Sequence, residues 1–95
     1  VEGHPTHPSA ATAAFTRGRL LRASLGRPAE AARSFARAID LGVPRSLEED
    51  AWARVVDASV AAGDLPGARE AAHRYDVRFP DGRRSDEIAR WIAPP

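Results

Sequence analysis

The segment Gly26-Arg27-Pro28-Ala29-Glu30-Ala31-Ala32 has a counterpart in Gly63-Asp64-Leu65-Pro66-Gly67-Ala68-Arg69, which begins 37 residues later. In both segments a proline follows the glycine, and both lie between amphipathic stretches of helical periodicity. Glycine ends helices because it adopts the left-handed conformation without steric cost, and proline is tolerated in a helix's first turn. The repeated pattern therefore predicts two antiparallel helix-turn-helix pairs. No stretch alternates as a strand does, so we expect an all-α fold of about five helices.

The first predicted pair covers about residues 10–41. Ser9 is expected to cap a helix over residues 10–25, and Pro28 begins a second helix that stops at Gly42. Apolar and small residues recur at spacings of three and four in both helices. The expected inner faces contain Ala11, Ala14, Phe15, Gly18, Leu21, Leu25, Ala31, Ala32, Phe35, Ala38 and Ile39.

The second predicted pair covers about residues 46–79 and is followed by a short helix over 85–93. Ser46-Leu47-Glu48-Glu49 has the pattern of a capping box, in which serine caps the helix and glutamate bonds back to it. Asp64 and Ser85 are expected to cap the next two helices. The expected inner faces contain Ala51, Trp52, Val55, Val56, Ser59, Ala62, Ala68, Ala71, Ala72, Tyr75, Phe79, Ile88, Trp91 and Ile92.

The chain divides into a flexible N-terminal segment, residues 1–8, and one helical domain over residues 9–95. The first segment lacks periodicity and contains two prolines. Because the chain starts at Val1 rather than at methionine, we expect it to be a domain of a longer protein. No apolar run approaches the ~20 residues that span a bilayer, so this segment is not expected to insert into a membrane directly.

At these positions the chain resembles the tetratricopeptide-repeat family, whose period is about 34 residues. The matching residues of the second pair are Trp52, Gly63, Ala68, Tyr75 and Pro80. Those of the first pair are Phe15, Gly26, Ala31, Phe35, Ala38 and, one residue late, Pro44. The resemblance covers about residues 10–80, and extra residues around 43–49 lengthen the repeat. It implies a short solenoid of stacked helix pairs that binds a protein or peptide partner.

A narrower similarity lies in the tail, where Tyr75 is followed by Phe79-Pro80-Asp81-Gly82 and a helix containing Trp91. This tail is similar to bacterial envelope versions of the repeat. They include outer-membrane assembly lipoproteins, cell-division coordinators and the C-terminal domains of FecR-like anti-sigma regulators. The similarity implies a periplasmic or cell-envelope location, with a cytoplasmic one left open.

The family resemblance also implies a partner-binding groove formed by the first helix of each pair. Its positions here are Thr16, Leu20, Asp50, Ala53 and Asp57. The carboxylates of Asp50 and Asp57 would suit a basic or amine-bearing peptide. The alternative is that Asp50 pairs with Arg54, four residues later on the same helix. Trp91 either covers the core or presents a hydrophobic anchor, since tryptophan is enriched at binding hot spots.

Other classes of function find little support in the residues. The chain has no cysteine, and His4 and His7 lack a third ligand, so we expect no metal and no cofactor. It has neither a glycine-rich phosphate loop nor a Gly-x-Ser-x-Gly turn, so we expect no catalytic residues and no enzyme. The densest basic stretch, Arg17 to Arg27, has no interleaved aromatic residue, and the net charge is +1, so nucleic acid is an unfavoured partner.

The two halves of the chain have opposite charge. Residues 1–47 contain seven arginines and three acidic residues, whereas residues 48–95 contain seven arginines and ten acidic residues. The halves could pair with each other or end to end between copies. We therefore expect a protein-interaction scaffold, with a self-associating structural domain and an arginine-based nucleic-acid binder as alternatives.

A single helix pair cannot bury both of its apolar faces, and the sequence provides only two pairs and one further helix. The last helix is expected either to cap the second pair or to begin a third repeat. The exposed face of the first pair is expected to be covered by upstream chain, a second copy or the functional partner.

Overall fold

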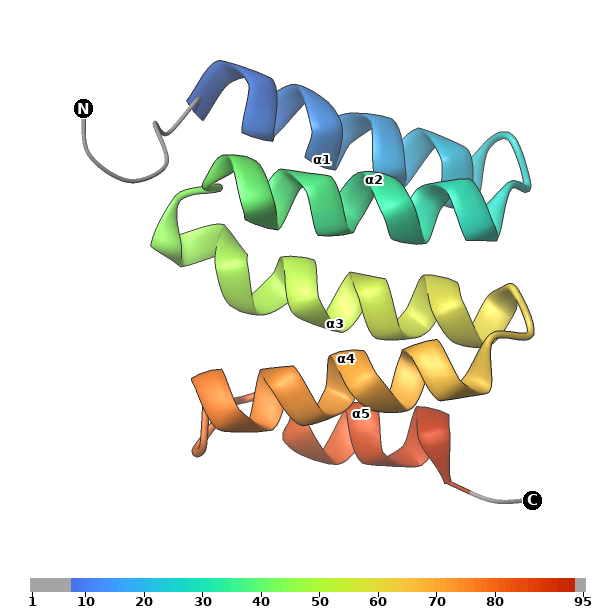
Figure 1. Cartoon of the computed structure of the whole chain (residues 1–95), viewed down its shortest axis with the longest axis vertical. Coiled ribbons are helices and arrows are strands. Elements are labelled where there is room, and N and C mark those ends of the chain that lie inside the picture. Colours follow the sequence, from blue (N-terminus) through green and yellow to red (C-terminus); the bar gives the residue numbers. More distant parts are fainter. Residues whose placement is uncertain (1–7, 94–95) are drawn as a thin grey trace.

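The computed structural model describes residues 8–93, and these residues form five helices and no strand (Figure 1). The helices are α1 Pro8–Ala23, α2 Pro28–Leu41, α3 Arg45–Ala61, α4 Leu65–Arg78 and α5 Ser85–Ile92. Consecutive helices run in opposite directions and pack against one another. The predicted all-α class and helix number are confirmed. Most of the expected flexible segment, residues 1–7, lies outside the described residues, and Pro8 already belongs to α1.

The repeated glycines lie in the turns that follow the first helix of each pair, three residues after Ala23 of α1 and two after Ala61 of α3. Gly26 and Gly63 have φ angles of 61° and 76°, in the left-handed region that favours glycine. Beyond the second of them, the Asp64 carboxylate accepts a hydrogen bond of 3.0 Å from the Gly67 N–H and caps α4, as expected. The sequence repeat is therefore also a repeat of backbone conformation.

The predicted capping box at the start of α3 is wrong. Helix α3 begins at Arg45, and Pro44 holds the capping position with φ −53° and ψ 146°. Ser46 lies within the first turn, and no side chain caps this helix. The proline's fixed φ sets the start of the helix, and the capping position falls two residues before Ser46. Glu49 does not bond back to the helix start but reaches the chain near α5.

Three other predicted helix ends also differ from the structure. Ser9, the expected cap of the first helix, is the second residue of α1, which begins at Pro8. Arg84, rather than Ser85, precedes α5, and Ser85 is the first helical residue. Helix α1 ends at Ala23, because the N–H groups of Ser24 and Leu25 both bond to the Leu20 carbonyl in a closing turn. Leu25 is consequently 60% exposed rather than part of the core.

The first pair is held by a close contact between α1 and α2. The rings of Phe15 and Phe35 meet edge to face with centroids 5.5 Å apart. Gly18 lies directly over Phe35, since a Cβ at residue 18 would stand only 2.7 Å from the ring atom Cε1. The Arg54 guanidinium of α3 lies over both rings, 5.4 Å from the Phe15 centroid and 5.8 Å from that of Phe35. These contacts join the first pair to the second.

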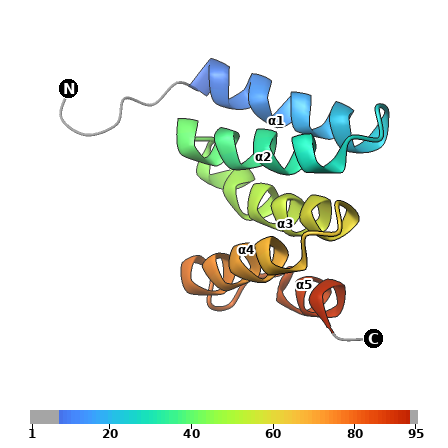
Figure 2. The ribbon, with the colours of Figure 1, turned by 45° about the vertical axis from the view of Figure 1, so that its right-hand side comes forward.

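The last helix, α5, closes the opposite end of the stack, where it packs against both α3 and α4. Its Ile88 is fully buried, and Trp91 and Ile92 pack partly buried against the core. Figure 2 shows the same order from another side, with α1 and α2 at one end and α4 and α5 at the other. No described helix is long and apolar enough to cross a membrane.

Candidate functional site

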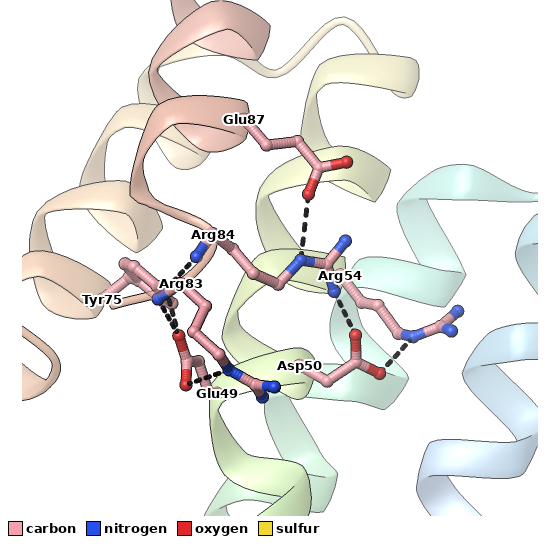
Figure 3. Close-up of polar contacts among 7 residues, drawn as sticks. All are labelled: Glu49, Asp50, Arg54, Tyr75, Arg83, Arg84 and Glu87. Atoms are coloured by element: carbon pink, nitrogen blue, oxygen red, sulfur yellow. Dashed lines mark hydrogen bonds and ion pairs between the residues drawn. The ribbon is translucent and has the colours of Figure 1, made fainter. Parts of the chain in front are cut away.

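The first acidic residue of the expected groove, Asp50, is already occupied by arginines of the same chain. Arg54 donates a hydrogen bond of 2.8 Å from Nε to Asp50 Oδ2. Arg84, which precedes α5, binds the other carboxylate oxygen through Nη1 (Figure 3). The interpretation of Asp50 as the partner of Arg54 is thus the one the structure confirms. The second arginine comes from 34 residues further along the chain.

The second acidic residue, Asp57, is also paired. Arg22 of α1 donates from Nε to Asp57 Oδ2 of α3 at 3.1 Å. Both side chains are little more than one-third exposed, so the pair bridges the two helices at a half-buried position. A basic peptide would therefore have to displace Arg22 from Asp57 and two arginines from Asp50.

The other predicted site residues do not form one surface. Ala53 is fully buried, so its expected place in an open groove is wrong. Thr16 and Leu20 are exposed on α1, with Leu20 at 53%. Trp91 is partly buried, and the Arg84 guanidinium lies 5.8 Å from its ring centroid. Of its two predicted roles, the packing contacts support covering the core.

A second set of polar contacts surrounds the buried Tyr75 of α4. Its hydroxyl donates to Glu49 Oε2 at 2.5 Å and accepts from the backbone N–H of Arg84 at 2.9 Å (Figure 3). The Arg83 N–H also donates to Glu49 Oε2, at 2.7 Å. Burial, reinforced by the Glu49 carboxylate, raises the pKa of Tyr75, while the Tyr75 hydroxyl holds the pKa of Glu49 below its ordinary value. All of these bonds fasten the segment before α5 to α3 and α4.

The same turn is shaped by a glycine at residue 82. A Cβ there would overlap the Tyr75 hydroxyl, because the nearest side-chain atoms occupy the place that it would take. On the outside of this region, Arg78 donates to both oxygens of Glu48 at 2.8 and 3.1 Å. That contact lowers the pKa of Glu48. The charged residues of the second half thus mainly satisfy one another.

The first pair, in contrast, has an open hollow of about 470 Å³ between α1 and α2, which we call the α1–α2 hollow. It is lined by Ala10, Ala13, Ala14, Arg17, Glu30, Arg33, Ser34, Arg37 and Leu41. Three alanines of α1 provide a floor of small side chains. Ser34 is a buried lining residue whose hydroxyl donates to the Ala14 carbonyl at 2.8 Å, so it holds the two helices together. Every lining residue belongs to α1 or α2.

The rim of this hollow has an excess of positive charge. Arg33 and Arg37 form no ion pair with any residue in the range 8–93. Glu30 lies 3.9 Å from Arg17 and 3.6 Å from Arg27, both of them loose exposed contacts. The arginines of α2 lie outside the basic stretch Arg17 to Arg27 that is densest in the sequence. Their signal was two like charges four residues apart on one helix face.

A smaller hollow of about 260 Å³ lies where α2, α3 and α4 meet. It is lined by Ala36, Ile39, Asp40, Trp52, Val55, Gly67, Glu70, Ala71 and Arg74. Its one close charged contact is between Arg74 and Glu70, at 3.3 Å. The two hollows share no lining residue, and this one is formed by α2, α3 and α4 rather than by α1 and α2.

Within residues 8–93, no three histidine, cysteine or acidic side chains lie close enough together to hold a metal ion. The considered pair His4 and His7 lies outside the described residues. The fold and hollows thus define a small all-helical protein of consecutively packed helices. Comparison of the chain with protein-family models, curated proteins and solved structures finds no match.

Proposed function

We propose that this chain is a tetratricopeptide-like scaffold that binds a protein partner on the outer side of its first helix pair. The observation that carries the proposal is the α1–α2 hollow, which is open, floored by alanines and lined by α1 and α2 alone. It shares no lining residue with the hollow formed by α2, α3 and α4. A short helical stack has such an uncovered face wherever no further helix is stacked on it.

The surface around the hollow supports a polypeptide as the occupant. Ala13 lies in the floor, and Leu20 stands seven residues later, which is two helical turns on the same face of α1. Leu20 is one of three large apolar side chains exposed in residues 8–93, so it extends the apolar floor along the helix. A small apolar centre with a charged rim is the usual composition of a protein interface.

The state of the expected groove supports the same choice. Its acidic residues Asp50 and Asp57 are bound by Arg54, Arg84 and Arg22, so they are already neutralised within the chain. The outer side of the first pair has charges without such partners. We therefore place the partner there rather than on the acidic residues of α3. We propose a location in the bacterial cell envelope because the Tyr75–Gly82 region is similar to envelope versions of the repeat.

Site-specific photo-crosslinking in the full-length protein tests the proposal. A photoreactive phenylalanine analogue would replace Ala13 in the hollow or, as the control, Ala89, which is exposed on α5. We expect a discrete adduct with a second protein from position 13 and none from position 89. An adduct of the chain with itself would support the self-associating alternative instead. The absence of any adduct from position 13 in native cells would overturn the scaffold proposal.

A further inference from the structure

We propose that the α1–α2 hollow binds an acidic amphipathic helix of a different protein. This inference rests on the proposed function and adds the chemistry and the conformation of the partner. It begins from the rim, where Arg17 stands on α1 and Arg33 and Arg37 stand on α2. Three arginines against the single Glu30 give the rim an excess of two positive charges.

The spacing of the α2 arginines matches that of a helical partner. Arg33 and Arg37 are four residues apart, so their Cβ atoms are about 5–6 Å apart along one face of α2. Two carboxylates four residues apart on a partner helix have the same spacing. Guanidinium groups bind carboxylates in a planar two-bond geometry, which adds specificity to the attraction.

The floor of the hollow fits the apolar side of such a helix. Helix axes pack 8–10 Å apart according to the size of the side chains between them, and alanine allows the closest approach. Ala10, Ala13 and Ala14 lie within two turns of α1. A partner helix can therefore lie along α1 and α2 with its apolar residues on the alanines and its carboxylates at the arginines.

The two arginines on α2 repel each other in the isolated chain. Like charges at positions i and i+4 destabilise a helix by roughly 0.2–0.5 kcal/mol. Other arginines avoid such a cost, since Arg22, Arg54 and Arg78 each contact an acidic residue within 3.1 Å. An unsatisfied like-charge pair beside an open hollow is expected where an anionic partner completes it.

A second copy of the chain does not fit this role. No two of its acidic residues stand three or four positions apart anywhere in the sequence, so none of its helices can present the matching pair of carboxylates. All four acidic residues of α3 are also bound by arginines of the same chain. Nucleic acid fits less well than a helix, because the lining contains no aromatic side chain for base stacking and includes Glu30.

The test uses the whole chain and a fluorescent probe peptide. The peptide is an alanine- and leucine-rich helix with glutamates four residues apart on the two edges of its apolar face, and its matched control has glutamine at the same positions. Binding is measured by fluorescence anisotropy to the chain, to the R33A/R37A variant and to the R69A/R90A variant. The last variant removes two exposed arginines that form no ion pair within residues 8–93 and lie outside the hollow.

We expect the glutamate peptide to bind at least about tenfold more tightly than the glutamine peptide, which corresponds to about 1.4 kcal/mol. R33A/R37A should abolish this preference, and R69A/R90A should change it less than twofold by the same measure. Equal affinity for both peptides, no binding of either, or an unchanged preference in R33A/R37A would overturn the inference. Tighter binding of a single-stranded oligonucleotide through the same arginines would overturn it in favour of nucleic acid.

The crosslinking experiment distinguishes failure of the acidic-helix proposal from failure of the scaffold proposal. If position 13 still forms an adduct in R33A/R37A, or if the crosslinked segment lacks acidic residues four apart, the scaffold stands and the acidic helix does not. If position 13 forms no adduct, both proposals fail. If sedimentation shows a dimer, and if the R33A/R37A variant is a monomer, the occupant of the hollow is a second copy of the chain rather than a helix of a different protein.

Discussion

The two ends of the helix stack use their charged side chains in different ways. At the α4–α5 end, Glu49 and Asp50 bind groups that precede α5, and Glu48 binds Arg78. At the α1–α2 end, Arg33 and Arg37 line an open hollow and have no acidic partner within residues 8–93.

The difference shows which part of the molecule its own residues complete. Contacts across 26 to 34 residues close the end that contains α5. The first pair has aromatic packing between α1 and α2 but leaves its outer rim unmatched. Polar contacts within the chain thus complete one end, while the other end has arginines, unpaired within the described part of the chain, beside the hollow where we propose that the partner binds.

The largest expected effect comes from breaking the aromatic contact of the first pair. Phe35→Ala removes a fully buried ring and leaves a cavity beneath Gly18, so we expect it to lower the free energy of unfolding by about 3–5 kcal/mol. Urea denaturation followed by circular dichroism measures the change. The exposed Leu25→Ala is the control, expected to cost less than about 0.5 kcal/mol. Similar costs for both would contradict the assignment of Phe35 to the core.

The next largest effect is expected from breaking the polar contacts at the α4–α5 end. Tyr75→Phe removes the donor to Glu49 and the acceptor of the Arg84 N–H, at an expected cost of about 1–3 kcal/mol. Because Tyr75 and Glu49 act on each other, we expect the cost of the double variant with Glu49→Gln to fall below the sum of the single costs. Additive costs in a double-mutant cycle would show that the two side chains are not coupled.

A smaller effect should follow from acid. The pKa values of Glu48 and Glu49 are lowered by their hydrogen bonds in the fold, so below neutral pH the unfolded chain takes up protons first. The stability that they contribute is present above the ordinary carboxyl pKa of 4.5 and is lost as pH falls through the lowered values. Hydrogen exchange should therefore show α4 and α5 losing protection in acid before α1 and α2. If α1 and α2 lose protection before α4 and α5 as the pH falls, the ion pairs of Glu48 and Glu49 do not stabilise the α4–α5 end in the expected way.

The smallest expected effect on the free energy of unfolding comes from removing one arginine at the hollow. Arg33→Ala relieves the repulsion with Arg37, so we expect the free energy of unfolding to rise by about 0.2–0.5 kcal/mol. Arg69→Ala is the matched control, because it makes the same exchange at an exposed helix position without a neighbouring arginine one turn away. The gain of the first variant over the second, measured by thermal denaturation, gives the repulsion from Arg37 less any attraction from Glu30, which stands three residues before Arg33. No difference between them would mean that the rim carries no cost.

Local residue patterns predicted the helices well where a single residue decides the backbone. As expected, α2 begins at Pro28 and is followed by Gly42, and Asp64 caps α4. The prediction at Ser46 failed because Pro44 sets the start of α3 and because Tyr75, 26 residues away from Glu49, takes up that glutamate. A capping pattern records only neighbours in sequence, so it cannot register such a competitor.

The site was harder to predict for the same reason. The pairing of Asp50 with Arg54 follows from their spacing, but its second partner Arg84 and the pairing of Asp57 with Arg22 depend on how the helices pack. The hollow arises from small residues on two helices that meet only in the fold. The position of the hollow could not be predicted without the structure, whereas the like-charge pair on α2 is visible in the sequence.

The Tyr75 hydroxyl occupies the place that a side chain at residue 82 would need, so the two positions constrain each other. A chain that replaces Gly82 must move or lose the tyrosine, and with it the direction in which α5 leaves α4. Among relatives of this protein, tyrosine at the one position and glycine at the other should accordingly be inherited together. A sequence that keeps only one of them should orient its last helix differently.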